Sequence, residues 1–235
     1  MIVEILFQEV CGLYGDSQNA TYLQACLPDA EFVFTKLTDT PYFAENNPDM
    51  IYIGCMSESI QRRVISKLLP LKDRIKQLID SGVVILATGN AGEIFSKQID
   101  YVTEKIKVDA LGIFDLIVKT DLFNRYNGVV LGSFGDIKIT GFRSQFSFLY
   151  GNNTDHPFIL CERGIGMNPN SKLEGMRKNN LFCTQLLGPI LPLNPLFCEY
   201  LLQLCGINTP AAYREDALAA YEQRLYEFQN AKSSH

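Results

Sequence analysis

Histidine and paired cysteine motifs are scarce in this sequence. Its 235 residues include only two histidines, His156 and the last residue, His235, and no two cysteines are spaced as Cys-x-x-Cys. Because zinc sites are built mainly from histidine and cysteine side chains, the sequence predicts no metal site, and nothing in it indicates another cofactor. The seven cysteines are odd in number and irregular in spacing, which indicates reduced thiols in a cytoplasmic protein rather than a disulfide framework.

Long apolar runs and basic character are also missing. No run approaches the length of a membrane span, and the first segment, MIVEILFQEV, carries Glu4 where a signal peptide has basic residues, so we expect a strand there. The net charge of -5 and the isoelectric point of about 5.1 disfavour nucleic acid and anionic membranes as partners. The patterns GxxxxGK[ST] and GxGxxG after a strand are absent, so no nucleotide site is predicted.

The first hundred residues alternate between buried strands and amphipathic helices. Apolar runs predict strands, and apolar residues at spacings of three and four predict helices, one of them long and kinked at Pro70. Strands are expected at 2–7, 31–37, 49–54 and 83–88, and helices at 19–27, 57–81 and 92–98. This alternation is typical of a parallel sheet covered on both faces, with ligands at the carboxyl ends of the strands, here 10–16, 54–58 and 88–92.

The second half changes to strands separated by glycine, asparagine and aspartate turns. Strands are expected at 115–121, 129–134, 136–142, 158–162 and 181–187, with Asn127-Gly128 as a hairpin turn. Helices are expected at 195–204 and from 210 to about 231, followed by a frayed tail at 232–235. The sequence predicts one α/β domain over residues 1–235. Its fold has three layers, with a mainly parallel central sheet flanked by helices and an antiparallel extension from the second half.

The stretch VVILATGNAGEIF, residues 83–95, combines a strand, a tight turn and a helical start. Many α/β enzymes use such a turn to present a nucleophile or to bind a phosphate group. Here the turn itself, TGNAG, contains no cysteine, serine or lysine. The sequence therefore predicts a turn with catalytic geometry but without a catalytic residue.

Four stretches, taken in order along the chain, resemble segments of one enzyme family. They are LYGDSQN at 13–19, IGCMSE at 53–58, GIGMN at 164–168 with Glu174-Gly175 after it, and LGPILPLNP at 187–195. Over nearly the whole chain they resemble class I glutamine amidotransferases of the cobyric acid synthase type. Within that family the similarity points to the glutaminase subunits of lipid II isoglutaminyl synthases. The resemblance implies a flavodoxin-like fold, a separate ATP-dependent ligase as partner and a glutamine-like small molecule as ligand.

The family's catalytic positions carry the wrong residues here. In the family, a strand-end cysteine in a CGGYQ turn attacks glutamine, a histidine in an HGP segment transfers protons, and backbone amides of a glycine-rich turn hold the oxyanion. The nucleophile position falls on Gly89, the base position on Leu187 and the oxyanion turn on Cys55-Met56, so the resemblance implies no intact catalytic residue. The candidate pocket consists of Cys55, Met56, Gly89, Asn90, Glu93, Arg143 and Leu187, where Glu93 replaces the glutamine of CGGYQ.

Several of the residues near this turn have two interpretations. Cys55 is either a replacement nucleophile or a small residue that fills a disused pocket, and the lack of a nearby histidine favours the second. If the match slips by one residue, Thr88 takes the nucleophile position, but no base is near it in sequence. His156 lies in a polar loop, which favours a surface position over a general base. Cys183 lies within an expected strand, which favours the core.

Arg143 and the loop before the first expected helix also allow two interpretations. Arg143 stands in GFRS, which resembles the family's GFEN segment, and its guanidinium suits either a carboxylate ligand or a surface salt bridge. Gly15, Asp16 and Asn19 are interpreted first as turn and helix-cap residues and second as a polar wall of the pocket. The last expected helix indicates core or partner packing.

Three functional hypotheses follow. The first is a degenerate amidotransferase-like subunit that cannot hydrolyse glutamine alone and serves as partner of a Mur-ligase-like, ATP-dependent enzyme, or binds a small molecule. The second is a working amidotransferase with a non-standard nucleophile such as Cys55, supplying ammonia to amidate a cell-wall precursor or a cobyric-acid-like substrate. The third is an interaction module that binds no ligand.

Overall fold

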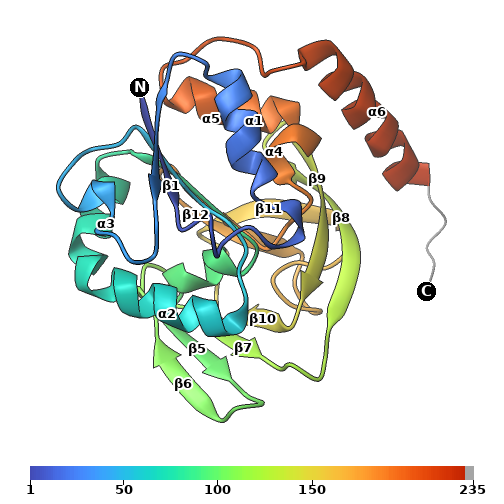
Figure 1. Cartoon of the computed structure of the whole chain (residues 1–235). Coiled ribbons are helices and arrows are strands. Elements are labelled where there is room, and N and C mark those ends of the chain that lie inside the picture. Colours follow the sequence, from blue (N-terminus) through green and yellow to red (C-terminus); the bar gives the residue numbers. More distant parts are fainter. Residues whose placement is uncertain (231–235) are drawn as a thin grey trace.

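Nine strands form one sheet through the middle of the computed structural model, which describes residues 1–230 (Figure 1). The parallel part contains β2 (Glu31–Thr35), β1 (Ile2–Leu6), β3 (Met50–Ile53), β4 (Val84–Thr88) and β13 (Leu181–Thr184), in that order. The sheet continues antiparallel through β12 (Leu173–Lys178), β11 (Pro157–Arg163), β8 (Tyr126–Phe134) and β9 (Ile137–Gln145). The predicted parallel sheet with an antiparallel extension is confirmed.

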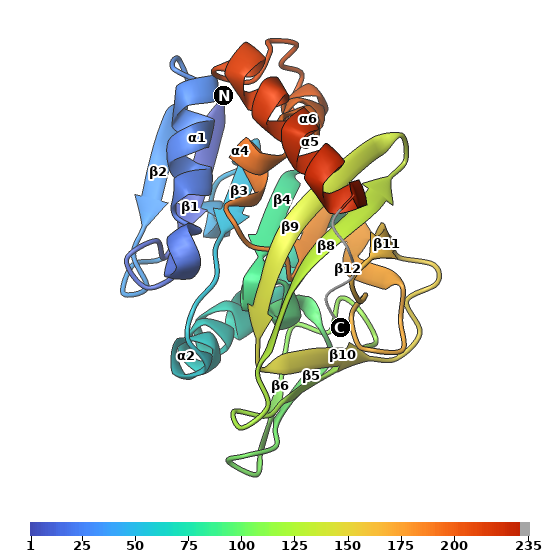
Figure 2. The same cartoon turned by 90° about the vertical axis from the view of Figure 1, so that its right-hand side faces the viewer.

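Helices cover both faces of this sheet, which confirms the three layers (Figures 1 and 2). One apolar core contains residues of α2 (Glu58–Leu68) and α3 (Lys72–Asp80). The other contains residues of α1 (Gln18–Cys26), α4 (Ile190–Leu193) and α5 (Pro195–Leu204). Successive strand residues alternate between the cores: Val84 and Leu86 belong to the second, Ile85 and Ala87 to the first. This two-sided burial explains why the strand reads as one continuous apolar run.

The long helix expected at 57–81 is divided at Pro70, as predicted. Helix α2 ends at Leu68, a 3-10 segment, η3 (Leu69–Leu71), contains the proline, and α3 starts at Lys72. Proline has no N–H to donate and its ring crowds the preceding turn, so a continuous helix is disfavoured there. At the other end, the Ser57 hydroxyl accepts a hydrogen bond from the Ile60 N–H and caps α2.

The helix predicted at 92–98 is wrong. The chain forms a 3-10 segment, η4 (Gly89–Phe95), and then enters strand β5 (Gln98–Tyr101). The η4 segment lies directly on β13: a Cβ atom at Gly92 would lie 3.1 Å from the Cβ of Cys183 and 3.4 Å from the backbone nitrogen of Thr184. Because Gly92 has no side chain, the backbone of η4 can lie close to the sheet here, and it does so instead of forming the predicted α-helix.

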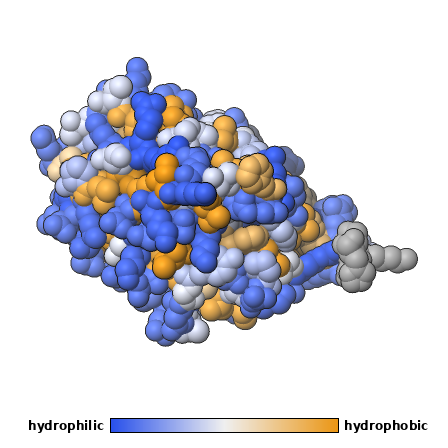
Figure 3. All heavy atoms as spheres, turned by 90° about the horizontal axis from the view of Figure 1, so that it is seen from below, coloured by the Kyte–Doolittle hydropathy of each residue, from blue (hydrophilic) through white to orange (hydrophobic). Residues whose placement is uncertain are grey.

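Four short strands were missed: β5, β6 (Ile106–Asp109), β10 (Ser147–Tyr150) and β12. All but β12 belong to a second sheet, in the order β10-β7-β5-β6, where β7 (Ile117–Thr120) lies inside the strand expected at 115–121. The strands β5, β6 and β10 have four residues each, which is too few for a recognisable periodicity, whereas β12 has six. Seen from below, the molecule shows apolar patches broken up by hydrophilic side chains (Figure 3).

The hairpin predicted at Asn127-Gly128 is wrong as well. Strand β8 passes through both residues, and Gly128 is paired with Arg143 on β9. The turn comes at Gly135-Asp136, between the paired residues Phe134 and Ile137, and Gly135 has a φ of +56°. The asparagine-glycine signal competed with a second turn eight residues later, and the pairing of β8 with β9 along its whole length outweighed it.

The carboxyl-terminal helices follow the prediction in part. Helix α5 has the predicted bounds, whereas α6 (Arg214–Asn230) begins four residues after Pro210. Within α6, Tyr221 is the buried residue, and its hydroxyl donates to the Lys138 carbonyl at 2.7 Å. The predicted helix end at 231 and the tail at 232–235 lie outside the described residues. None of the described helices has the length and apolar character to cross a lipid bilayer.

Candidate functional site

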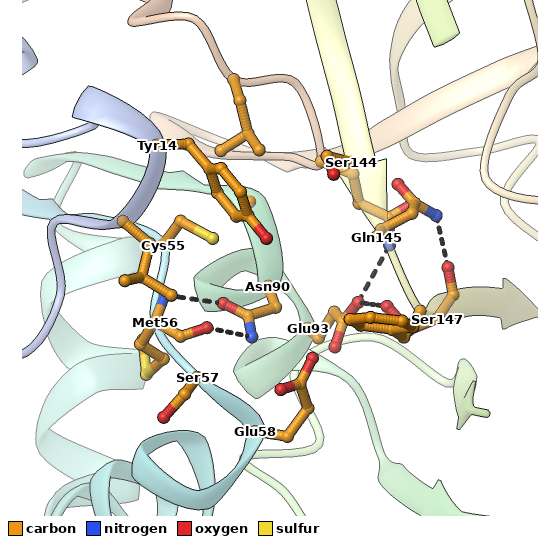
Figure 4. Close-up of a pocket in the computed structure, with 15 residues that line it drawn as sticks. Tyr14, Cys55, Met56, Ser57, Glu58, Asn90, Glu93, Ser144, Gln145 and Ser147 are labelled. Carbon is orange, nitrogen blue, oxygen red and sulfur yellow. Dashed lines mark hydrogen bonds between the residues drawn. The ribbon is translucent and has the colours of Figure 1, made fainter. Parts of the chain in front are cut away.

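A cavity of about 80 Å³ lies at the carboxyl ends of β3 and β4 (Figure 4). This is where the alternating pattern predicted a ligand site. Six of the seven candidate pocket residues line it: Cys55, Met56, Gly89, Asn90, Glu93 and Leu187. Leu13, Tyr14, Ser57 and Glu58 also line the cavity, and they lie in the strand ends 10–16 and 54–58 where ligands were expected. The remaining wall comes from segments that sequence reasoning did not connect with the site, with Ser144, Gln145, Phe146, Ser147 and Gln185.

Gly89, Cys55 and Leu187 meet in one corner of the cavity. Gly89 directly follows β4 and has a φ of +59°, in the left-handed region that favours glycine. A Cβ atom at residue 89 would lie 2.7 Å from the Cβ and 2.8 Å from the Sγ of Cys55, and 3.0 Å from Cδ2 of Leu187. The space for a side chain at residue 89 is therefore occupied by two side chains from distant parts of the sequence.

Cys55 sits in surroundings that disfavour a thiolate. Burial, followed by the negative charge of Asp16 and then those of Glu93 and Glu58, raises the pKa of its thiol to about 12, although a backbone hydrogen bond with Asn90 acts in the opposite direction. The expected surface histidine, His156, is exposed and packs its ring edge-on against Phe114. Among residues 1–230, Cys55 thus has acidic neighbours and no neighbouring imidazole, the reverse of an activated cysteine site.

The amides of the Cys55-Met56 turn are already hydrogen-bonded within the protein. The Cys55 N–H donates to Oδ2 of Asp16 at 2.7 Å, and the Met56 N–H donates to Oδ1 of Asn90 at 3.0 Å. The Asn90 side chain also donates through Nδ2 to the Met56 carbonyl at 2.7 Å, so it pairs with Met56 like a neighbouring strand (Figure 4). An oxyanion needs free donors in such a turn, and both amides here are satisfied.

Asp16 has a tertiary role that differs from both interpretations, since it does not line the cavity. Ser17, the residue before α1, makes no side-chain cap, and the Asp16 carboxylate accepts hydrogen bonds from the Cys55 N–H, the Thr88 hydroxyl and the Asn19 amide. Burial raises the pKa of Asp16 to about 6, against the effect of these donors. The helix-cap interpretation of Asp16 is wrong: the carboxylate fixes the ends of β3 and β4 from behind the cavity wall.

Thr88 has the neighbouring base that was missing in sequence. Its hydroxyl donates to Oδ2 of Asp16 at 2.5 Å, and the two residues are 72 positions apart. Thr88 is fully buried and does not line the cavity. Its hydroxyl therefore serves the hydrogen-bond network of the strand ends, with Asp16 and Tyr52 as its partners.

Glu93 is held by donors on three sides. Its Oε1 accepts from the Ser147 hydroxyl and from Nε2 of Gln185, and its Oε2 accepts from Nε2 of Gln61 at 2.9 Å. Burial raises the pKa of Glu93 to about 6, and these three donors lower it. Because every partner donates, the network favours the ionised carboxylate and keeps it in place.

Arg143 differs from both predictions made for it. It is fully buried and lies outside the cavity lining, and its guanidinium donates to the carbonyls of Ile165 and Gly166 and to the side-chain oxygens of Gln145 and Gln185. It is neither a ligand for a carboxylate in the cavity nor part of a surface salt bridge. Its donors orient two glutamines of the cavity wall. Because hydrogen bonds join β9 to segments twenty to forty residues away, no local pattern could indicate this role.

The remaining candidates fit structural roles. Cys183 is fully buried in β13 beneath η4, as predicted. Leu187 is fixed by its backbone, which exchanges hydrogen bonds of 2.7 and 3.1 Å with Phe142. Within residues 1–230, no group of three or more histidine, cysteine, aspartate or glutamate side chains is arranged to hold a metal ion.

Comparison with known proteins places this geometry in context. No protein-family model matches the sequence. The chain is 29% identical over 198 residues to the GatD subunit of the glutamine-hydrolysing lipid II isoglutaminyl synthase of Staphylococcus aureus strain N315, which covers 81% of this chain and 78% of that protein.

Solved structures share the fold at low sequence identity. A glutamine amidotransferase crystal structure matches with a TM-score of 0.58 at 13% identity, covering 88% of this chain and all of the other. A glutamine amidotransferase of Thermotoga maritima matches with a TM-score of 0.52 at 9% identity, covering 98% of both chains. PurLQS of the same organism matches with a TM-score of 0.54 at 9% identity, covering 95% of this chain and 98% of the other. This chain therefore has the α/β fold of glutamine amidotransferases, and its sequence is similar to that of GatD.

Proposed function

We propose that this chain is a degenerate glutamine amidotransferase-like subunit of the cobyric acid synthase type. As a pseudoenzyme, it has no glutaminase activity of its own. It forms a single domain over residues 1–235 and keeps the scaffold and a small cavity of the active enzymes. It works in the cytoplasm, as the non-catalytic partner of a Mur-ligase-like, ATP-dependent enzyme or as a protein that binds a glutamine-like molecule.

The observation that carries this proposal is the filled corner at Gly89. The family's nucleophile position carries glycine, and the side chains of Cys55 and Leu187 occupy the space that a cysteine there would need. The turn amides that would hold an oxyanion are bonded to Asp16 and Asn90. A cysteine introduced at residue 89 would therefore collide with the cavity wall. This packing supports the proposal that glutaminase activity was lost and that the surrounding side chains now fill the space of the nucleophile.

Two observations support the proposed role as a subunit. GatD is named as a subunit of a synthase. This chain carries neither phosphate-binding glycine pattern, so an amidation that consumes ATP would need a second chain. These two points support a partner ligase and, with it, the amidation of a cell-wall precursor as the process served.

The alternative is a working amidotransferase that uses Cys55. One observation favours it: the Cys55 thiol lies in the space next to residue 89 and lines the same cavity. For this alternative to hold, a partner chain must supply a base and lower the pKa of Cys55 from about 12.

A glutaminase assay separates the two hypotheses. Glutamate release from glutamine is measured for the chain alone and with its candidate ligase, and we expect none above background from this chain. Turnover that Cys55→Ser abolishes and Cys205→Ser leaves unchanged would overturn the degenerate assignment and support Cys55 as nucleophile. Cys205 is the matched control because its partly exposed side chain lies outside the cavity.

Ligand binding is tested separately by thermal shift with glutamine and glutamate. Glu58 lines the cavity and points towards Glu93 (Figure 4), so it is the carboxylate available to the ammonium group of an amino acid. We expect Glu58→Gln to reduce the shift, while Glu215→Gln on the exposed face of α6 leaves it unchanged. No shift with either compound would favour the interaction module.

A further inference from the structure

Cys26 and Cys198 form a close pair of thiols away from the cavity. Cys26 is the last residue of α1 and Cys198 lies in α5, and their Sγ atoms are 4.0 Å apart. Both helices pack on the same face of the large sheet (Figure 1), and both cysteines belong to the apolar core there. The pair joins two segments that are 172 residues apart in sequence.

Cys26 has hydrogen-bond partners on two sides. The Ala212 N–H donates to its Sγ at 3.2 Å, and its Sγ shares a hydrogen bond with the Cys198 thiol, in which either sulfur can donate. The hydrogen bond with Cys198, followed by that from Ala212, lowers the pKa of Cys26 against the effect of burial, whereas the pKa of Cys198 is raised. Two thiols 4.0 Å apart, one of which accepts a backbone N–H, form the arrangement that disulfide chemistry uses.

The other five cysteines lack this arrangement. Burial is the largest cause that raises the pKa of each of them: Cys11, Cys55, Cys161, Cys183 and Cys205. Exposure alone would single out Cys205, which is the most accessible of the seven. The hydrogen bonds single out Cys26 instead.

We propose that Cys26 and Cys198 are a redox-active dithiol site that a hydroperoxide oxidises to an intramolecular disulfide. The Cys26 sulfur attacks one peroxide oxygen, the O–O bond breaks, and the departing oxygen leaves as water, so that Cys26 becomes a sulfenic acid. The Cys198 sulfur then attacks Cys26, the S–S bond forms, and the S–O bond breaks to release a second water with the Cys198 proton. Two thiols lose two electrons, and one hydrogen peroxide is reduced to two waters.

Oxidation at this site reaches the carboxyl-terminal helix through Ala212. In the dithiol state, α1 holds Ala212 by two hydrogen bonds: the Tyr22 hydroxyl donates to its carbonyl at 2.8 Å, and its N–H donates to Cys26. A disulfide requires sulfurs about 2.05 Å apart, so the two sulfurs must approach by roughly 2 Å, and a disulfide sulfur is a weak acceptor. The disulfide therefore weakens the hold on residues 207–213, which connect α5 to α6.

Mass spectrometry of the full chain tests the site. The reduced protein is treated with equimolar hydrogen peroxide, remaining thiols are blocked with iodoacetamide, and the protein is digested without reductant. We expect the linked peptides containing Cys26 and Cys198, lost again on treatment with dithiothreitol and retained in Cys205→Ser. Oxidation of Cys205 with Cys26 and Cys198 both alkylated would overturn the proposal. This test uses the unaltered protein, so it does not depend on a cysteine variant that folds.

Hydrogen exchange tests the coupling to α6. Loss of one hydrogen bond is worth about 1 kcal/mol, which corresponds to about fivefold faster exchange through local opening. We expect this acceleration at residues 207–230 in the oxidised protein, with α2 and α3 unchanged as internal controls. Cys198→Ala should keep the slower rate after the same peroxide treatment. Unchanged exchange at 207–230 in a fully disulfide-linked sample would overturn the coupling.

Discussion

The two ends of α1 place cysteine thiols in opposite environments. Before its first turn, Asp16 directs a carboxylate at the Cys55 amide, and burial with this negative charge raises the pKa of the Cys55 thiol to about 12. At its last residue, Cys26 accepts a hydrogen bond from the Ala212 N–H and shares another with the Cys198 thiol, and its pKa is lowered. The exposed fractions are nearly equal, 5% for Cys55 and 7% for Cys26. Burial raises the pKa of both thiols, but hydrogen bonds outweigh it at Cys26, whereas neighbouring negative charges add to it at Cys55.

This contrast indicates that a reactive thiol is to be expected at Cys26, outside the cavity, rather than at Cys55 within it. The cavity lies at the carboxyl ends of parallel strands, where α/β folds bind ligands, yet its thiol has acidic neighbours and its corner is filled. The α1–α5 contact lies outside this cavity, yet its thiol is the one whose pKa hydrogen bonds lower. Three substitutions test this comparison, from the largest expected effect to the smallest.

The largest effect is expected from Gly89→Ala in the filled corner. The new Cβ would meet the Cys55 side chain at 2.7 Å in a left-handed backbone conformation, so overpacking and strain together should lower the free energy of unfolding by about 3–4 kcal/mol. Urea denaturation measures this. Gly135→Ala is the matched control because Gly135 has a similar φ, +56°, with no atom within 4 Å of the new Cβ, and it should lose only the strain contribution.

A second variant locates the collision. Adding Cys55→Gly to Gly89→Ala removes the side chain that stands closest and should restore most of the lost stability. Equal losses for Gly89→Ala and Gly135→Ala, or no recovery in the double variant, would contradict the filled corner.

An intermediate effect is expected from Asp16→Asn on the pH dependence of stability. The folded-state pKa of about 6 is above the ordinary value of 3.8, so the folded protein binds this proton more tightly. The resulting stabilisation is complete below about pH 4 and is lost as the pH rises through 6, which amounts to about 2–3 kcal/mol. Unfolding free energies at pH 4 and pH 7 should therefore differ less in Asp16→Asn than in the unaltered protein.

The same variant also tests the state of Cys55. Without the Asp16 charge, the pKa of Cys55 should fall, which titration of the thiolate absorbance measures.

For the pH dependence of the unfolding free energy, Asp121→Asn is the control. Hydrogen bonds from Asn124 and the Phe123 amide lower the pKa of Asp121, whereas the pKa of Asp16 is raised. Parallel stability curves for Asp16→Asn and the unaltered protein would contradict the role assigned to Asp16.

The smallest effect is expected from Tyr22→Phe at the other end of α1. It removes the hydrogen bond to the Ala212 carbonyl, at a cost of about 1 kcal/mol. Hydrogen exchange should accelerate at residues 207–230 and leave β3 and β4 unchanged. Tyr213→Phe is the nearby control, since its side chain is 74% exposed. Equal acceleration in both variants would show that the Tyr22 hydroxyl does not hold this segment.

Much of the fold could be predicted because its signals are local. The apolar runs of β3 and β4, the divided helix at Pro70 and the start of α5 at Pro195 each depend on neighbouring residues. The predictions of a helix at 92–98 and of a hairpin turn at Asn127-Gly128 were both wrong for the same reason. Packing against β13 and pairing with β9 outweighed the local preference.

The residues of the candidate site could likewise be predicted from the sequence only in part. Six of the seven candidate pocket residues line one cavity, because the carboxyl ends of parallel strands meet at one edge of the sheet. Gln145, Ser147 and Gln185 were missed because nothing in their own sequence surroundings distinguishes them from surface residues. Arg143 was misjudged because a buried guanidinium is satisfied by partners that only folding brings to it.

The sequence by itself determined the alternation of strands and helices, the glycine in the turn after β4 and the leucine at residue 187, because residue identity and spacing are written in the chain. Tertiary structure alone decided that Cys55 fills the space beside Gly89, that Asp16 and Asn90 occupy the turn amides, and that Cys26 meets Cys198. The reason is distance: these partners are between 34 and 172 residues apart, and only the packing of α1, α5 and the strand ends sets their contacts.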